Sequence, residues 1–252
     1  MSPEAYSAAA VAVVLTGVSK SGFAGGLGIL GVPLVALTMP PQDAAVLLLP
    51  VLLGIDLLSV WRYRSDWTAR IVVALLPGAV IGIGLGMVSF ADLDPDLLRI
   101  AIGLMALVFV GTHLRHRPTS RDAAPRAQWP KVFLASMMSG FAGFVAHAGG
   151  PPIKGTLLSL NLGKTAFVAT NAIFFFTLNL TKAAGYTALG LFSAQSLLGA
   201  LSLTPFLVLG VWLGFALHTR VSQTLFVRLA YILLSVAGLN LIVIGVAALA
   251  AG

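Results

Sequence analysis

Hydrophobic residues run along the chain in long stretches that short polar or glycine-rich segments separate. A helix needs about 20 apolar residues to cross the hydrocarbon of a bilayer. The stretches at 26–38 and 149–160 are too short to cross unaided, and both follow glycine-rich sequence. The pattern predicts an all-α polytopic membrane protein with broken or re-entrant helices at these two places. The predicted membrane elements are 5–20, 26–38, 44–61, 71–90, 97–112, 132–148, 149–160, 166–187, 194–217 and 225–249.

The second half of the pattern repeats the first. The segment SGFAG occurs at residues 21–25 and again at 139–143, and each copy precedes one of the short stretches. A proline followed by two glycines at the same spacing occurs at 77–86 and again at 205–214. Such recurrence indicates an internal duplication with about five membrane elements per copy. The predicted parts are an N-terminal repeat at 1–114, a basic linker at 115–130 and a C-terminal repeat at 131–252.

Charged residues lie mainly between the hydrophobic stretches and predict the orientation. The segments 61–70, 112–131 and 218–228 are basic, so the positive-inside rule places them in the cytoplasm. The segment 91–96 is acidic and both termini lack positive charge near the membrane, so we expect these parts outside, in the periplasm. The two repeats then enter the bilayer in opposite senses. Inverted-topology repeats are typical of secondary transporters, whose interrupted helices meet near the midplane at the substrate site.

Composition agrees with a membrane protein and excludes several functions. Of the 252 residues, 58% are hydrophobic and 9% are charged, which leaves too little charge for a soluble surface. The net charge of +7 comes mainly from the basic loops, so it does not indicate nucleic acid binding. The chain has no cysteine, and His113 and His116 lack a third ligand nearby. We therefore expect no disulfide, no metal site and no cofactor.

Glycine in the two breaks is interpreted as part of a transport site. Glycine lets the backbone turn and lets a ligand approach the amide groups. The free N–H groups at the start of a second half-helix suit an anion. The glycines predicted to contribute are Gly25, Gly26, Gly28, Gly149 and Gly150. Close helix packing is the alternative role, and we prefer it for the glycines four apart in full-length stretches, namely Gly82, Gly86, Gly210 and Gly214.

Ionisable residues inside the hydrophobic stretches indicate the sign of the substrate charge. Asp56 is the acidic residue within a stretch, whereas Lys20, Lys154 and Lys182 all lie in or beside stretches. Three lysines against one aspartate favour an anionic substrate. The alternative for each lysine is snorkelling, in which the long stem carries the ammonium to the headgroups. For Lys182, near the outer end of its stretch, both interpretations stay open.

Other polar residues follow the second break. His147 lies inside it and either donates to an anion, carries a proton or caps a broken helix end. Asn171, Asn179 and Thr170 lie in the next stretch, as substrate contacts or as interhelical hydrogen bonds. Asp56 and His147 are the candidates for ion coupling. The candidate substrate-binding residues are Lys20, Ser21, Gly25, Gly26, Gly28, His147, Gly149, Gly150, Lys154 and Asn171.

Several segments resemble one known family. GVPLVAL and PPQDAAVLLLP in the first half, with GGPP, NLGKTAFVATN and KAAGYTALGLFS in the second, resemble the TauE/SafE sulfite exporter family, also called the toluenesulfonate uptake permeases. The likeness covers nearly the whole chain. It implies transport of small sulfur oxyanions and organosulfonates across the bacterial inner membrane. His147 and the few consecutive glycines in the first break depart from the pattern of many relatives.

These observations lead to a hypothesis of secondary transport, with export of a small sulfur-containing anion such as sulfite or an organosulfonate. An inside-negative membrane potential drives anions outward, so an exporter needs no coupling ion. The alternative is a proton- or sodium-coupled importer of a small organic anion. A channel or a membrane-embedded enzyme is less favoured, because the sequence shows no catalytic cluster. The expected partners are the substrate and the lipid bilayer, and a homodimer stays open.

Overall fold

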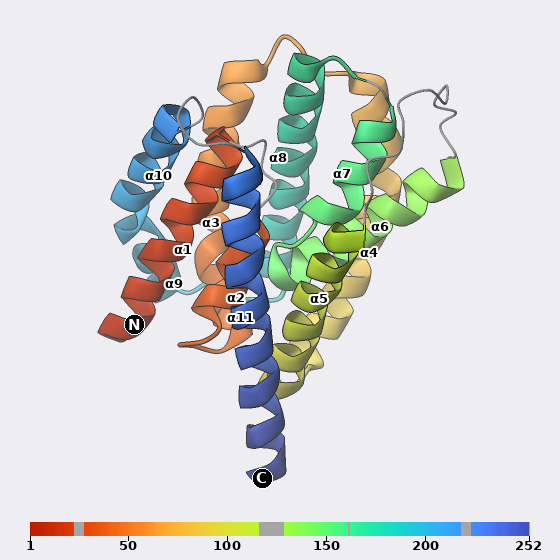
Figure 1. Ribbon diagram of the computed structural model, residues 1–252. Helices are drawn as coiled ribbons and strands as arrows, with labels where there is room; N and C mark the ends of the chain where they lie inside the picture. The colour runs from red at the N-terminus through yellow and green to blue at the C-terminus, as the bar shows by residue number, and fades with distance from the viewer. Residues whose placement is uncertain (23–27, 116–128, 161, 218–222, 252) are drawn as a thin grey trace.

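The computed structural model describes residues 1–22, 28–115, 129–160, 162–217 and 223–251. All regular structure in these ranges is helical, as the hydrophobic pattern predicts. The elements, labelled in Figure 1, are α1 Pro3–Gly22, η1 Gly28–Leu30 (a 3₁₀-helix), α2 Gly31–Val35, α3 Pro41–Tyr63, α4 Ala69–Asp92, α5 Pro95–Arg115, α6 Trp129–Ala146, α7 Gly150–Ser159, α8 Lys164–Ala188, α9 Ala194–Ser202, α10 Thr204–Leu217 and α11 Gln223–Ala251.

Six helical segments among the described residues are long and apolar enough to cross a bilayer. Large hydrophobic side chains remain exposed on their outer faces, for example Val88 and Val108. Exposed apolar surface on this scale suits contact with lipid and not with water. The chain is therefore a multi-pass helical membrane protein. The six candidate spans are Pro41–Tyr63, Ala69–Phe90, Pro95–Thr112, Thr165–Ala188, Ala194–Gly214 and Arg228–Ala251.

Both predicted short stretches are short in the structure. The first forms η1 and α2, and the second forms α7, so neither crosses a bilayer by itself. In the second break, where His147 was expected, the SGFAG copy at 139–143 is still helical and lies inside α6. The chain leaves the helix only at His147. Residues 23–27, most of the first SGFAG copy, lie outside the described residues.

One predicted span is divided in two. The stretch 194–217 forms α9 and α10, which separate at Leu203. Pro205, two residues later, has no backbone N–H and its ring crowds the carbonyl of the preceding turn. The helix therefore breaks just before the proline.

Close packing between helices explains the glycines that recur four residues apart. Gly82 of α4 lies against α6, and a Cβ at this position would lie 2.8 Å from the amide nitrogen of Phe141. Gly210 of α10 lies against α1, where a Cβ would lie 2.7 Å from the carbonyl oxygen of Val14. Both distances are too short for a real side chain. The packing interpretation of these glycines is confirmed, and it extends to Gly140 of the SGFAG copy in α6.

The main helix pairs join one half of the chain to the other. Helix α1 packs on α10, α4 on α6, α5 on α11 and α3 on α8. In Figure 1, α1 rises from the N terminus at the lower end, and α11 descends to the C terminus at the same end. The connection from α3 to α4 lies at the opposite, upper end.

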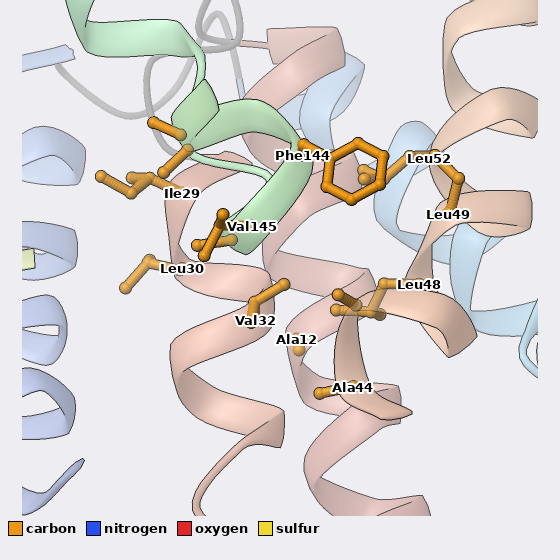
Figure 2. Packing of buried hydrophobic residues seen from close by; sticks show 14 of the residues in the cluster. Ala12, Ile29, Leu30, Val32, Ala44, Leu48, Leu49, Leu52, Phe144 and Val145 are labelled. Atoms are coloured by element: carbon orange, nitrogen blue, oxygen red, sulfur yellow. The ribbon is translucent and has the colours of Figure 1, made fainter. Parts of the chain in front are cut away.

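Buried apolar side chains hold the interrupted segments in the centre of the bundle. Ile29 and Leu30 of η1 are almost fully buried, and so are Phe144 and Val145 at the end of α6. Figure 2 shows these residues together with the side chains of α3, among them Leu48, Leu49 and Leu52. The two breaks thus share one core with α3, which positions the cavity described next.

Candidate functional site

A cavity lined by apolar and polar side chains opens inside the bundle where the two interrupted segments meet. Gly28 and Ile29 line it from the first half, and His147, Gly149, Gly150 and Pro151 line it from the second. Helices α1, α3 and α8, together with His147 between α6 and α7, supply its polar side chains. The cavity volume is about 60 Å³, which holds about four water molecules or an anion of similar size.

The end of α6 is fixed by hydrogen bonds to carbonyl groups that the helix leaves open. The Tyr186 hydroxyl donates to the carbonyl of Phe144 at 2.7 Å. The Ser139 hydroxyl donates to the carbonyl of Gly149 at 2.7 Å, which ties the break back to α6. Polar backbone groups at this depth need such partners, because lipid offers none. The cavity therefore has a well-defined wall at the second break.

Asp56 of α3 lies at the centre of a chain of polar contacts. Its side chain is 3% exposed, and one carboxylate oxygen forms an ion pair with the ammonium of Lys20 on α1. The other oxygen accepts a hydrogen bond from the Asn179 amide nitrogen of α8 at 2.5 Å. Because both oxygens are engaged, the carboxylate is held in place between the two halves of the chain.

Lys182 continues this chain one helical turn along α8. The residue is 2% exposed, and its ammonium donates to the amide oxygen of Asn179 at 2.8 Å. It also lies 2.6 Å from Nδ1 of His147. Both partners are uncharged when His147 is neutral, and no carboxylate within the described residues forms an ion pair with Lys182. A buried cation normally has a countercharge, so Lys182 marks a place where an anion is favoured.

His147 joins the second break to the cavity. Its Nε2 lies 2.9 Å from the carbonyl oxygen of Ala45, and a carbonyl only accepts. Its Nδ1 faces the Lys182 ammonium, which only donates, while the Gly143 carbonyl lies farther away at 3.3 Å. These neighbours assign the neutral tautomer with the proton on Nε2 and with Nδ1 as the acceptor. The backbone φ of 53° is left-handed, a conformation that histidine adopts more readily than most residues.

The cavity carries a positive formal charge. Among its described lining side chains, Lys20, Asp56 and Lys182 carry formal charge when both lysines are counted as protonated. The Lys20 ammonium also lies 5.9 Å from the centre of the Phe175 ring. With one carboxylate against two ammonium groups, the lining has a net formal charge of +1, which suits a small anion.

The N terminus of α7 offers fewer free backbone N–H groups to an anion than the sequence suggests. Gly150 begins this helix and lines the cavity, as predicted. Pro151 and Pro152 follow directly, and proline has no backbone N–H. Two of the free N–H groups of the first turn are therefore absent.

The structure brings most predicted site residues together and places some elsewhere. Those that line the cavity are Lys20, Gly28, His147, Gly149, Gly150 and Asn171, with the coupling candidate Asp56. The Ser21 hydroxyl instead donates to the carbonyls of Gly17 and Val211, so it lies at the contact of α1 with α10. Gly25, Gly26 and the side chain of Lys154 lie outside the described part of the chain.

For three further residues the sequence left two roles open, and the structure bears on each. The snorkelling alternative for Lys182 is wrong, because the side chain is buried in the bundle and lines the cavity. Asn179 makes an interhelical hydrogen bond, so that interpretation is confirmed; it also lines the cavity, and its contact with substrate stays a prediction. Thr170 has a structural contact, since its hydroxyl accepts from the amide of Thr68 before α4 at 3.0 Å.

The fold and the cavity together define a class, that of polytopic helical membrane proteins with a positively charged site inside the bundle. The model of the sulfite exporter TauE/SafE family matches residues 9–241, and the chain belongs to this family. Its members are membrane transporters of sulfur anions and are not enzymes. No curated protein and no solved structure compared with the chain matches it.

Proposed function

We propose that the protein exports a small sulfur-containing anion, such as sulfite or an organosulfonate, through the cavity between its two halves. The observation that carries this proposal is the buried amino group of Lys182, which lines the cavity and, within the described residues, hydrogen-bonds to the uncharged groups of Asn179 and His147. An anion in the cavity supplies the missing countercharge. Lys20, Asn171 and the backbone at Gly28, Gly149 and Gly150 are the further contacts that we assign to the substrate, while His147 positions Lys182.

The helix pairs support a plan of two inverted repeats. In the proposed repeat, α1 corresponds to α6, α4 to α10 and α5 to α11. The contact of α1 with α10 then has its counterpart in the contact of α6 with α4, and the equivalent helices α5 and α11 contact each other. Short connections at 64–68 and 93–94 make α3, α4 and α5 alternate in direction. Helix α11 descends in Figure 1, whereas its counterpart α5 follows the descending α4 and so rises. Opposed repeats around one site can expose it to either side of the membrane in turn.

Export requires no coupling ion. An inside-negative potential moves each negative charge outward with about 2.3 kcal/mol per 100 mV. We place the basic segments in the cytoplasm, and the termini and the acidic segment 91–96 in the periplasm. The second candidate function is proton-coupled import, which the contact of His147 with Lys182 favours. An imposed pH gradient separates the two, because an uncoupled exporter does not depend on it.

Flux driven by an imposed potential in proteoliposomes tests the proposal. The Lys182→Gln variant removes the cationic group and keeps an uncharged donor of similar length. We expect the flux of sulfite or methanesulfonate to fall by a factor of about 30 or more, as for other truncated buried charge contacts. Lys131→Gln, at an exposed position near the start of α6, is the matched control and should leave flux unchanged. Equal flux in wild type and Lys182→Gln contradicts the proposal.

A further inference from the structure

We infer that Asp56 makes the site selective for singly charged sulfur oxyanions over doubly charged ones. This inference rests on the proposed function, and it assigns to Asp56 a role in charge selection instead of ion coupling. The carboxylate neutralises one of the two cavity lysines and leaves the formal charge of one ammonium for the substrate. A monoanion then brings the cavity to electrical balance, whereas a dianion leaves one excess negative charge.

The contacts of Asp56 hold this negative charge in the wall. Lys20 and Asp56 form an ion pair with side chains 14% and 3% exposed, so solvent screens the pair little. Asn179 occupies the second carboxylate oxygen. Three helices, α1, α3 and α8, thus fix the carboxylate. It cannot turn away when a substrate enters.

Lys182 lacks such a carboxylate partner of its own. Asn179 separates it from Asp56, because the amide donates to the carboxylate and accepts from the ammonium. The other contact of the ammonium is the neutral imidazole of His147. The net charge of +1 is therefore concentrated on the side of the cavity formed by α8 and the second break. An uncompensated second charge on the substrate is strongly unfavourable there, because the low-dielectric interior solvates it poorly.

Two anions that differ in charge but hardly in shape can serve as probes of this selectivity. Methanesulfonate and sulfate are both tetrahedral sulfur oxyanions with five heavy atoms, and a methyl group in the first replaces an oxygen in the second. Their size matches a cavity of about 60 Å³. The ratio of their affinities therefore reports mainly on the charge that the site accepts. Comparing this ratio between variants removes the remaining difference between methyl and oxygen.

Calorimetric titration of the purified full chain with each anion, at constant ionic strength, measures the ratio. Wild type should bind methanesulfonate more tightly than sulfate. In Asp56→Asn the formal charge of the lining rises by one, and the ratio should shift toward sulfate by about tenfold or more. In the matched control, Lys20→Gln with Asp56→Asn, both members of the ion pair lose their charge. The net charge is restored, and the ratio should return to that of wild type.

Several results overturn the inference. These are tighter binding of sulfate than of methanesulfonate by wild type, an unchanged ratio in Asp56→Asn, or an equal shift in the double variant. The double variant keeps the test decisive where Asp56→Asn does not fold, because removal of a whole buried pair is tolerated better than removal of one partner. If wild type binds neither anion, the proposed function fails, and this inference fails with it.

Discussion

The imidazole of His147 acts between a backbone carbonyl and a buried ammonium. Its Nε2–H faces Ala45 of α3, and its Nδ1 accepts from Lys182 of α8. The ring therefore fixes the direction of the lysine side chain in a cavity where a free ammonium has several rotamers. We regard His147 as a positioning residue that places the positive charge for the anion.

Replacing His147 with asparagine tests the imidazole ring without disturbing the backbone conformation. Asparagine tolerates the left-handed conformation at φ 53° but does not bridge Ala45 and Lys182. We expect His147→Asn to raise KM for anion flux about tenfold with little change in Tm, because one hydrogen bond to a charged group is lost. In His147→Leu, a residue poorly suited to this conformation, Tm should fall as well. A His147→Asn variant with wild-type KM contradicts the positioning role.

Part of the site was predictable at the level of single residues. Lys20, His147 and the glycines beside the breaks were identified because they adjoin the interrupted segments in sequence. The links of Asp56 to Lys20 and to Asn179 were not predicted, since they join positions far apart in the chain. A signal existed for α8, where Asn179 and Lys182 are three residues apart and so share one face.

Glycines in α4 show how one helix serves two environments. Gly82 is buried against α6, where a Cβ would meet the backbone of Met137 and Phe141. Gly84, two residues further, is exposed, and a Cβ there would meet nothing within 4 Å. The difference follows from the helical period, which turns neighbouring positions toward opposite sides.

Alanine at the two positions gives a matched comparison. In Gly82→Ala the added methyl forces α4 and α6 apart, and overpacking of this kind costs about 1–3 kcal/mol. We expect Tm in detergent to fall by roughly 5 °C. Gly84→Ala should keep or slightly raise Tm, because alanine favours the helix. Equal effects of the two substitutions on Tm contradict the proposed packing of α4 on α6.

The positions of the elements were more predictable than the places where they break. Long apolar stretches gave the spans, because length and hydrophobicity alone decide whether a helix can cross lipid. His147 was expected inside the second break, and the helix does end there, but the SGFAG segment before it is helical. Glycine weakens a helix by only about 1 kcal/mol per residue, and packing of Gly140 against α4 offsets this. Local sequence does not reveal that packing.

The whole molecule brings one interrupted segment from each half to a common cavity. The repeated glycine-rich stretches led to the prediction of this meeting in outline, since a shared site between two interrupted helices is typical of transporters. Helix α1 of the first half packs on α10 of the second, and α6 of the second packs on α4 of the first. These pairings could not be predicted from the local hydrophobic pattern. The net charge of the cavity likewise depends on contacts among α1, α3 and α8.

The most direct test of the central claim is anomalous diffraction from crystals soaked with selenite at mildly acid pH, where this analogue of sulfite carries one negative charge. We predict a selenium peak in the cavity between Gly28 and Gly149, placed so that a selenite oxygen accepts a hydrogen bond from the Lys182 ammonium. The peak should vanish in Lys182→Gln. An empty cavity in wild type, or a peak that persists without the lysine charge, contradicts the account.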